Sequence, residues 1–446
     1  MSPLQVPRAR IAPPRARWLA FAPGVAMTAW AATSARSIQG GGGTRGLCFG
    51  SLLLAACFLL GAARDRPIPR PSRLACQELD ALTVVAIVPV FNEDPDALRN
   101  CLESLLAQTR PLEGIVVVDD GSDAVDYAAL STRFERLAAR RGTQASWVRA
   151  EHAGKRHAHA IAIRRRSDAD VYLLVDSDTV LDPAATREAM FGFADARVQS
   201  VVPVILAHNY GRNLLTRTSE LMLAVQQLSE RSVLSLTGSI LINSGAAAYY
   251  RATVLHDHVE TYVGETFRGR PVTFSDDSLL TLFALRRGRT VHQTTAFAFT
   301  DVPERLDHYR RQQLRWMRGS VIRSLWRFRY LPLDRVGYWI HLVKWVQYVV
   351  ISIVLILIVL TAAHPTLHFL LWLAIVNVGL GLLLNGRYLT LQRSDQTLME
   401  QLGVYLLAPL VPIWNGILMR PLRWWAFMTV MRLEWGTRRA VEISER

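Results

Sequence analysis

The sequence predicts an α/β domain with a mostly parallel sheet, standing on an α-helical transmembrane platform that includes helices lying in the membrane interface. Three observations predict this fold class. Residues 83–305 alternate short β-branched runs with amphipathic stretches, as strands and crossover helices do. Uncharged segments close to membrane-spanning length lie on both sides of this region. Arginines interleave with aromatic residues where the region meets the later apolar segments, a composition that suits a membrane interface.

The composition excludes a disordered chain and argues against one ordinary soluble domain. Half of the residues are hydrophobic, and 446 residues is long for a single core. The net charge is +14, and only two of the 51 basic residues, Lys155 and Lys344, are lysines. A basic excess is typical of proteins that bind nucleic acid, an anionic membrane surface or an anionic substrate. The positions of the arginines along the chain indicate which of these classes applies.

The first part of the chain is predicted to be a basic cytoplasmic tail followed by a membrane hairpin. Residues 1–17 contain four arginines and no acid. Trp18–Ala35 and Gly46–Ala63 are uncharged segments of 18 residues each, so residues 18–63 predict a transmembrane hairpin. A signal peptide is the alternative for the first segment. Arginines flank the pair on both outer sides, which places both flanks in the cytoplasm.

The elements of the α/β domain can be placed by their patterns. Thr83–Val90, Gly114–Val118 and Val171–Val175 are β-branched, apolar runs and predict buried strands. Pro95–Ala107 is amphipathic and predicts the helix between the first two. This rhythm predicts parallel strands joined by crossover helices, and ligands of such sheets bind beyond the carboxyl ends of the strands.

The remainder of the chain is basic and then apolar. Residues 306–335 predict amphipathic helices in the membrane interface, and residues 336–384 predict transmembrane helices. Residues 398–430 contain two prolines within an apolar run, which favours a broken, re-entrant or interfacial segment over a clean span. Residues 431–446 form the C-terminal tail.

Two acidic motifs follow predicted strands. Asp176 and Asp178 are spaced so that their carboxylates point the same way on an extended chain, and together they can hold a hard divalent cation. A surface turn is the alternative. Asp119 and Asp120 can accept hydrogen bonds from a nucleobase or from ribose hydroxyls, and an Asx-capped turn explains them equally well.

Two further motifs carry charge at positions that suit catalysis. Lys155, followed by Arg156, is one of only two lysines, which indicates that a compact ammonium is needed there. The alternative is a solvated loop charge. Asp276 and Asp277 precede a helical pattern, and a carboxylate there can act as a general base. Taken alone, the pair is better explained as a helix N-terminal cap.

Two motifs lie in the basic C-terminal half. Gln312, Arg315 and Trp316 fall in the arginine-rich stretch, where the guanidinium can stabilise a diphosphate and the indole can stack on a sugar. An amphipathic interface helix explains the same residues, and both interpretations can hold together. Trp435-Gly436-Thr437-Arg438 near the C-terminus is unspecific by itself.

Taken in order, these motifs resemble those of the processive family-2 glycosyltransferases. The hyaluronan synthases are the most similar group, and the rhizobial chitin-oligosaccharide synthases come next. The resemblance covers roughly residues 83–440, and its specificity lies in the order and spacing of the motifs. It also includes Ile87–Glu93, Ser244-Gly245, Tyr250-Arg251, Gln293–Thr295 and Thr300–Pro303.

The resemblance implies a GT-A catalytic domain over residues 83–305 and a role for each motif. The residues implied at the nucleotide are Asp119, Asp120, Lys155, Arg156 and Asp176. Asp178, with Asp176 nearby, would bind Mg²⁺ or Mn²⁺ on the diphosphate. Asp277, beside Asp276, would be the general base. The diphosphate and acceptor sugar would contact Gln312, Arg315 and Trp316, and the gating loop would be Trp435, Gly436, Thr437 and Arg438.

The sequence departs from the hyaluronan synthase pattern at a few positions. Ser275 precedes the acidic pair where those synthases usually have glycine, and Ala246 stands where they have proline. The stretch from Gln312 to Trp316 is closer to the chitin-oligosaccharide synthases. These differences bear on which sugar is used.

Three functions follow as expectations. The first is a hyaluronan synthase that polymerises UDP-GlcNAc and UDP-GlcA by inverting transfer and secretes the polysaccharide through its helices. The second is a chitin-like or other single-sugar synthase. The third is a membrane protein that binds a nucleotide sugar without catalysis. The expected location is the plasma membrane, as a multi-pass protein in the lipid bilayer with a cytoplasmic catalytic domain. The arginines mark membrane edges and a diphosphate site, so no nucleic-acid partner is expected.

Overall fold

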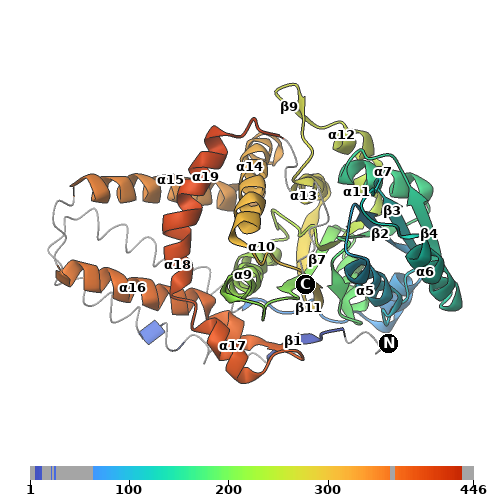
Figure 1. Cartoon of the computed structure of the whole chain (residues 1–446), viewed down its shortest axis with the longest axis horizontal. Coiled ribbons are helices and arrows are strands. Elements are labelled where there is room, and N and C mark those ends of the chain that lie inside the picture. The colour runs from blue at the N-terminus through green and yellow to red at the C-terminus, as the bar shows by residue number, and fades with distance from the viewer. Residues whose placement is uncertain (1–5, 13–21, 23–24, 27–63, 362–366, 434–446) are drawn as a thin grey trace.

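The computed structural model describes residues 6–12, 22, 25–26, 64–361 and 367–433 (Figure 1). Almost all of the predicted hairpin of residues 18–63 lies outside the described residues, as do Trp435, Gly436, Thr437 and Arg438. A sheet covered by helices occupies one end of the molecule in Figure 1. Two long helices extend away from it at the other end, α15 (Val336–Thr361) and α16 (Leu367–Asn385).

The central sheet has eight strands in the order β4-β3-β2-β5-β8-β7-β11-β6. The strands are β2 Val84–Val90, β3 Gly114–Asp119, β4 Gln144–Arg149, β5 Val171–Val175, β6 Val180–Leu181, β7 Val198–Ala207, β8 Ala247–Arg251 and β11 Arg289–Thr300. The helices that pack on this sheet include α5 Pro95–Leu106, α6 Ala128–Arg140, α7 Lys155–Arg165, α8 Ala185–Met190, α11 Ala252–His256, α12 Val259–Val263 and α13 Asp276–Arg287.

The predicted elements of the domain are confirmed with close boundaries. The strand β5 matches its prediction residue for residue, and β2, β3 and α5 differ from theirs by one residue. The helix α5 begins where the sequence provides a cap and a proline. The side chain of Asp94 accepts hydrogen bonds from the backbone N–H groups of Asp96 and Ala97, and Pro95 occupies the first helical turn.

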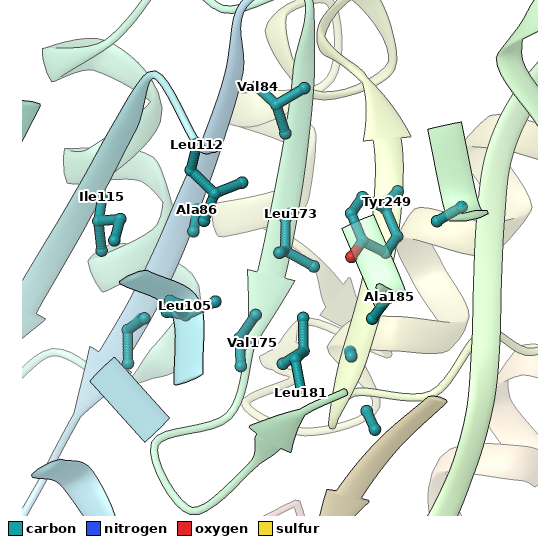
Figure 2. Packing of buried hydrophobic residues seen from close by; sticks show 14 of the residues in the cluster. Val84, Ala86, Leu105, Leu112, Ile115, Leu173, Val175, Leu181, Ala185 and Tyr249 are labelled. Carbon is teal, nitrogen blue, oxygen red and sulfur yellow. The ribbon is translucent and has the colours of Figure 1, made fainter. Parts of the chain in front are cut away.

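The core forms two hydrophobic layers, one on each face of the sheet. Val84, Ala86 and Val88 of β2 pack with α5, α6 and α8, whereas Val85 and Ile87 pack with α7, α11 and α13 on the opposite face. Figure 2 shows the first layer, where side chains of neighbouring strands meet over the sheet. Because alternate residues of a strand point to opposite faces, a strand covered on both sides has to be apolar throughout. Burying each large aliphatic side chain stabilises the fold by roughly 1.5–3 kcal/mol.

The sheet is mostly parallel, as predicted, but it is mixed because two of its strands, β8 and β6, run in the opposite direction. The strands β4, β3, β2 and β5 are parallel to one another, and β7 is parallel to β11. The strand β8, however, runs antiparallel to both β5 and β7, and β6 runs antiparallel to β11. A buried apolar run has the same composition in either direction, so the sequence pattern does not reveal a reversed strand.

The carboxyl ends of β2, β3 and β5 reach the same edge of the sheet, which we call the site edge. Because β8 is antiparallel, it begins at this edge, with Val175 paired to Ala247. The loop before β8 therefore lies beside the residues that follow β5, and Asp176 N donates to Ala246 O at 3.1 Å. The fold collects polar loops from four strands at one place.

The helix α14 (Leu306–Tyr330) lies between the sheet and the long helices (Figure 1). The region of residues 306–335, predicted as several interface helices, contains this one continuous helix of 25 residues. It packs against α13 on one side and against α19 (Arg420–Met428) on another. Two of its arginines, Arg323 and Arg327, are buried against the domain.

Among the described residues, one helical stretch is long and apolar enough to cross a membrane, Val336–Ile353 of α15. A second candidate is a bent pair, α17 (Leu398–Tyr405) with Leu410–Met428, whose two parts meet at 42°. The second part of the pair contains α18 (Leu410–Trp414), the π-helix η5 (Asn415–Met419) and α19. The bend occurs beside Pro409, and proline removes a helical hydrogen bond. The break agrees with the expected interruption of this segment, and its re-entrant or interfacial place in the membrane stays a prediction.

Part of the predicted basic tail joins the fold. The short strand β1 (Ala9–Ile11) pairs antiparallel with β12 (Leu391–Arg393), beyond α16. The backbone N–H of Arg8 also donates to Ser394 Oγ at 2.8 Å. The residues before the predicted hairpin are thereby fastened to the segment after α16.

Candidate active site

A cavity of about 3000 Å³ opens at the site edge and extends to the long helices. Its lining combines polar loops from the sheet with one face each of α14 and α15 and parts of α16, α18 and α19. The candidate residues that line it are Asp120, Lys155, Asp176, Asp178, Asp276, Asp277, Gln312, Arg315 and Trp316. The fold thus brings together nine positions spread over nearly 200 residues of sequence. Asp119 and Arg156 are not part of this lining.

The two acids at the end of β3, Asp119 and Asp120, make different contacts. Both are buried, but Asp119 Oδ1 accepts the backbone N–H of Ser122 at 2.9 Å and so closes a turn, as the structural alternative predicted. Asp120 faces the cavity and accepts backbone N–H groups of Ala153 at 2.9 Å and Gly154 at 2.9 Å. These bonds hold the N-terminus of α7 beside Asp120.

A flat aromatic surface beside Asp120 was missed by the sequence reasoning. The rings of Phe91 and His152 stack with centroids 4.1 Å apart, and both residues line the cavity. His152 Nδ1 lies 2.9 Å from Asp120 Oδ2. The signal was present, because Phe91 follows β2 and His152 precedes Gly154. Phe91 entered the sequence analysis only as part of the matching stretch Ile87–Glu93, and His152 was assigned no role.

Lys155 lies between the two acidic motifs. Its Nζ lies 2.5 Å from Asp176 Oδ1 and 3.2 Å from Asp276 Oδ2. Gly245 approaches this group from the loop before β8, and a Cβ placed on it would lie 3.6 Å from the ammonium nitrogen. Although burial disfavours the ammonium, the carboxylates of Asp176 and Asp276 raise the pKa of Lys155 above its usual range. The ammonium therefore stays charged and joins the loop after β5 to the start of α13.

The adjacent acids at the start of α13 have opposite proton affinities. Burial opposes ionisation of Asp276, but the ammonium of Lys155 holds the pKa of this carboxyl well below its usual value. Burial, and next the negative charge of Asp276, raises the pKa of Asp277 to about 6. Asp277 Oδ1 also accepts the backbone N–H of Ser278 at 2.6 Å within the first turn of the helix, whose cap residue, Ser275, makes no side-chain capping bond. A carboxylate with this pKa can accept a proton near neutral pH.

Asp176 and Asp178 offer two carboxylates to a metal ion. Asp178 Oδ1 accepts hydroxyl hydrogen bonds from Thr179 at 3.3 Å and Thr300 at 3.2 Å, which orient the group within the cavity. No group of three or more His, Cys, Asp or Glu side chains that could hold a metal occurs among the described residues. Two hard oxygen donors still fit Mg²⁺ or Mn²⁺, because such ions commonly complete their coordination with phosphate oxygens and water.

Gln312, Arg315 and Trp316 share one face of α14. Their spacing of three and four residues places them on neighbouring turns of one helix side. All three line the cavity, and the side chain of Trp316 is 50% exposed. An exposed indole beside a guanidinium offers an apolar surface next to an anion-binding group.

Arg156 does not face the cavity. Its Nη1 lies 2.8 Å from Glu265 Oε2, and its Nη2 donates to Phe274 O at 2.8 Å in the protein interior. Lys155 and Arg156 are successive residues of α7 and point about 100° apart, and of the two only Lys155 lines the cavity. The sequence motif was read as a basic pair, but α7 separates the two charges.

Comparison with known proteins agrees with this geometry. Residues 81–319 match the family described as glycosyltransferase like family 2. The hyaluronan synthase of Streptococcus pyogenes is 34% identical over 365 residues, which cover 81% of this chain and 84% of that protein. An N-acetylglucosaminyltransferase of Bradyrhizobium diazoefficiens is 34% identical over 251 residues, which cover 56% of this chain and 51% of the relative.

The fold is also shared with a solved structure. A mannosyltransferase from Pyrobaculum calidifontis, in complex with GDP-Man and Mn²⁺, aligns with a TM-score of 0.54 at 19% identity. The alignment covers 89% of this chain and 99% of that protein.

Proposed function

The chain belongs to glycosyltransferase family 2, and we propose that it polymerises UDP-GlcNAc and UDP-GlcA into hyaluronan. In this proposal the catalytic domain faces the cytoplasm and the protein crosses the plasma membrane several times. The similarity to the streptococcal hyaluronan synthase, which extends over most of both chains, supports this assignment.

The proposed reaction is an inverting transfer. Asp277 accepts the proton of the acceptor hydroxyl, whose oxygen forms a bond to the anomeric carbon of the donor while the bond from that carbon to UDP breaks. Arg315 and Gln312 on α14 stabilise the negative charge of the leaving diphosphate through hydrogen bonds. Mg²⁺ or Mn²⁺ held by Asp176 and Asp178 would supply further positive charge to that diphosphate. Asp120 and the surface of Phe91 and His152 would hold the base and ribose of the nucleotide.

The observation that carries the enzymatic proposal is the pair of adjacent acids with separated pKa values. Asp276 stays ionised beside Lys155, and burial with the charge of Asp276 raises the pKa of Asp277 to about 6. A protein that only binds a nucleotide sugar has no need of a base facing the cavity. This arrangement therefore disfavours the non-catalytic alternative.

The wall of the cavity that is formed by α14 and the helices after it has a composition that favours an anionic product. The lining residues that belong to α14, α15, α16, α18, η5 and α19 include no Asp or Glu in the described part of the chain. They do include the cations Arg315, Arg327, Lys344, Arg420 and Arg423. A polymer with a carboxylate on alternate sugars suits this wall better than a neutral chitin chain. We propose that the cavity is the entrance of the path by which the polymer leaves.

A chitin-like or other single-sugar product is the second candidate. The likeness to the Bradyrhizobium N-acetylglucosaminyltransferase and the stretch from Gln312 to Trp316 favour it. Ser275 and Ala246, which depart from the hyaluronan synthase pattern, also bear on this choice.

The two candidates separate in one assay. Purified protein in detergent with Mg²⁺ or Mn²⁺ is given UDP-GlcNAc with and without UDP-GlcA. The proposal predicts polymer only with both donors, and hyaluronidase degrades that polymer. Polymer from UDP-GlcNAc alone, degraded by chitinase, would establish the second candidate. Absence of UDP release in every condition would contradict both.

A further inference from the structure

A cluster of buried charges lies behind the loop that carries the acidic pair. Glu265 follows α12, and Arg156 and Arg323 approach it from α7 and α14. Arg323 is fully buried, Arg156 is 4% exposed and Glu265 is 9% exposed. Burying three charges is costly unless each is paired and hydrogen-bonded.

The carboxylate of Glu265 is bound on both oxygens. Arg323 forms a two-pronged pair with it, with Nη1 on Oε1 and Nη2 on Oε2 at 2.6 Å. Arg156 Nη1 reaches the same Oε2 at 2.8 Å, and Trp326 Nε1 donates to Oε1 at 3.0 Å. Such charge-assisted, bidentate bonds fix orientation as well as distance.

The same two arginines hold the loop that precedes Asp276. Arg156 Nη2 donates to Phe274 O at 2.8 Å, and Arg323 Nε reaches Ser275 O at 3.4 Å. The backbone of Ser275 is left-handed, with φ +61°, which a non-glycine residue adopts only when its surroundings impose it. The cluster supplies those surroundings through two consecutive carbonyl groups.

The helix α14 also touches this loop directly. A Cβ placed on Gly319 would lie 2.6 Å from Ser275 Cβ and 2.8 Å from Ser275 Oγ, so the side chain of Ser275 packs directly against the helix backbone at Gly319. Gly319 and Arg323 lie on the helix that also carries Gln312, Arg315 and Trp316. The loop with the acidic pair is thus fastened to the helix with the diphosphate-facing residues.

We propose that Glu265, acting through Arg156 and Arg323, is a positioning residue that sets Asp277 at a fixed place relative to Arg315. Glu265 lies outside the cavity lining and touches no reacting group. Its effect on the reaction passes through the carbonyls of Phe274 and Ser275. This inference rests on the proposed transfer reaction. It adds a means by which the base, Asp277, and the residues that contact the leaving group are held at a fixed relative position.

The first test is Glu265→Gln, which keeps the shape of the side chain and removes its charge. We expect kcat for UDP release to fall at least tenfold, while KM for the donors and binding of UDP change less than twofold. A looser loop exposes Asp277 to water, so the acidic limb of the kcat profile should move to lower pH. A merely structural ion pair would lower the melting temperature and leave kcat and the pH limb unchanged.

A second pair of variants tests the same contact without removing a buried charge. Gly319→Ala should lower kcat, because the added methyl group displaces Ser275. Ser275→Gly in the Gly319→Ala background removes the clashing atoms and accepts the positive φ, so it should restore kcat. Gly403→Ala, in α17 with open space around it, is the matched control and should leave kcat unchanged.

The outcomes separate the positioning role from the function itself. If the wild type releases no UDP from either donor, the proposed function fails and this inference falls with it. If the wild type is active and both Glu265→Gln and Gly319→Ala keep wild-type kcat and pH profiles, the positioning role alone is overturned. Failure of Ser275→Gly to restore Gly319→Ala would also contradict it.

Discussion

Lys155 Nζ lies 3.2 Å from Asp276 Oδ2, and this ion pair makes two adjacent carboxyls unequal. Asp276 is paired with the ammonium and remains ionised, so its negative charge raises the pKa of Asp277. Pairs of acids whose surroundings separate their pKa values are a common basis for acid–base catalysis. The sequence shows two identical residues, whereas the fold gives them different chemistry.

The first prediction concerns the pH dependence of the rate. Asp277 acts as a base only when deprotonated, and burial with the charge of Asp276 raises its pKa to about 6. The kcat for UDP release should therefore rise with pH through about 6 and then level off. Other charges also act electrostatically on Asp277 or Asp276, namely those of Lys155, Asp176, Arg231 and Arg327.

Asp276→Asn is the matched variant for this profile. Removing the neighbouring negative charge favours the ionised form of Asp277 and lowers its pKa, so the acidic limb of kcat should move to lower pH. The measurement is the kcat profile of both proteins between pH 4.5 and pH 8, a range of roughly two units on either side of the expected value. An unmoved limb would contradict the assigned coupling.

The second prediction concerns the proposed base. Asp277→Asn keeps the shape of the side chain but cannot accept the proton, so kcat should fall by about 10² to 10⁴. UDP binds through other residues, and its affinity, measured by calorimetry, should stay within about threefold. A variant that still makes polymer at the wild-type rate would remove Asp277 from the reaction.

The third prediction concerns the metal ion. Asp178→Asn replaces one of two hard carboxylate donors by a weaker neutral one, so the Mg²⁺ or Mn²⁺ concentration for half-maximal activity should rise by about tenfold or more. A metal titration of UDP release measures it. Asp168→Asn changes an acid outside the cavity lining and serves as the control, with no expected change. Equal metal dependence of the two variants would exclude Asp178 as a ligand.

The fourth prediction concerns the second lysine. Lys344 Nζ on α15 lies 2.5 Å from Glu230 Oε1, and both line the cavity. Without the ammonium, Glu230 would lose its ion-pair partner, and its negative charge would face the proposed path of a polyanion. Lys344→Met should therefore shorten the polymer, with little effect on release of UDP from UDP-GlcNAc alone.

A second substitution that restores product length provides the control for Lys344→Met. Glu230→Gln in the Lys344→Met background removes the uncompensated charge, so product length, measured by gel electrophoresis, should return toward that of the wild type. If the double variant makes chains as short as those of Lys344→Met, charge repulsion is not the cause.

The sequence predicts the sheet strands well where burial alone defines them. Val171–Val175 is apolar throughout because both faces are covered, and this pattern marks its ends sharply. The direction of β8 could not be predicted, because pairing direction is set by the path of the chain between strands. Local composition does not record that path.

The candidate site was predictable at the level of motifs but not of side-chain direction. Residues that follow β5 or lie on one face of α14 reach the cavity as their periodicity requires. Arg156 turns away because α7 begins at Lys155, a boundary that the sequence pattern did not reveal. The partner of Arg156, Glu265, is more than 100 residues away and belongs to no motif, so only the fold reveals the cluster.

The measurement that most directly tests the central claim is the sugar ratio of the product. Wild-type protein is given UDP-GlcNAc and UDP-GlcA with different radioactive labels, and the polymer is isolated by size. The account predicts equal incorporation of the two sugars and no polymer when either donor is omitted. Polymer that contains GlcNAc alone, or that forms at the same rate without UDP-GlcA, would contradict it.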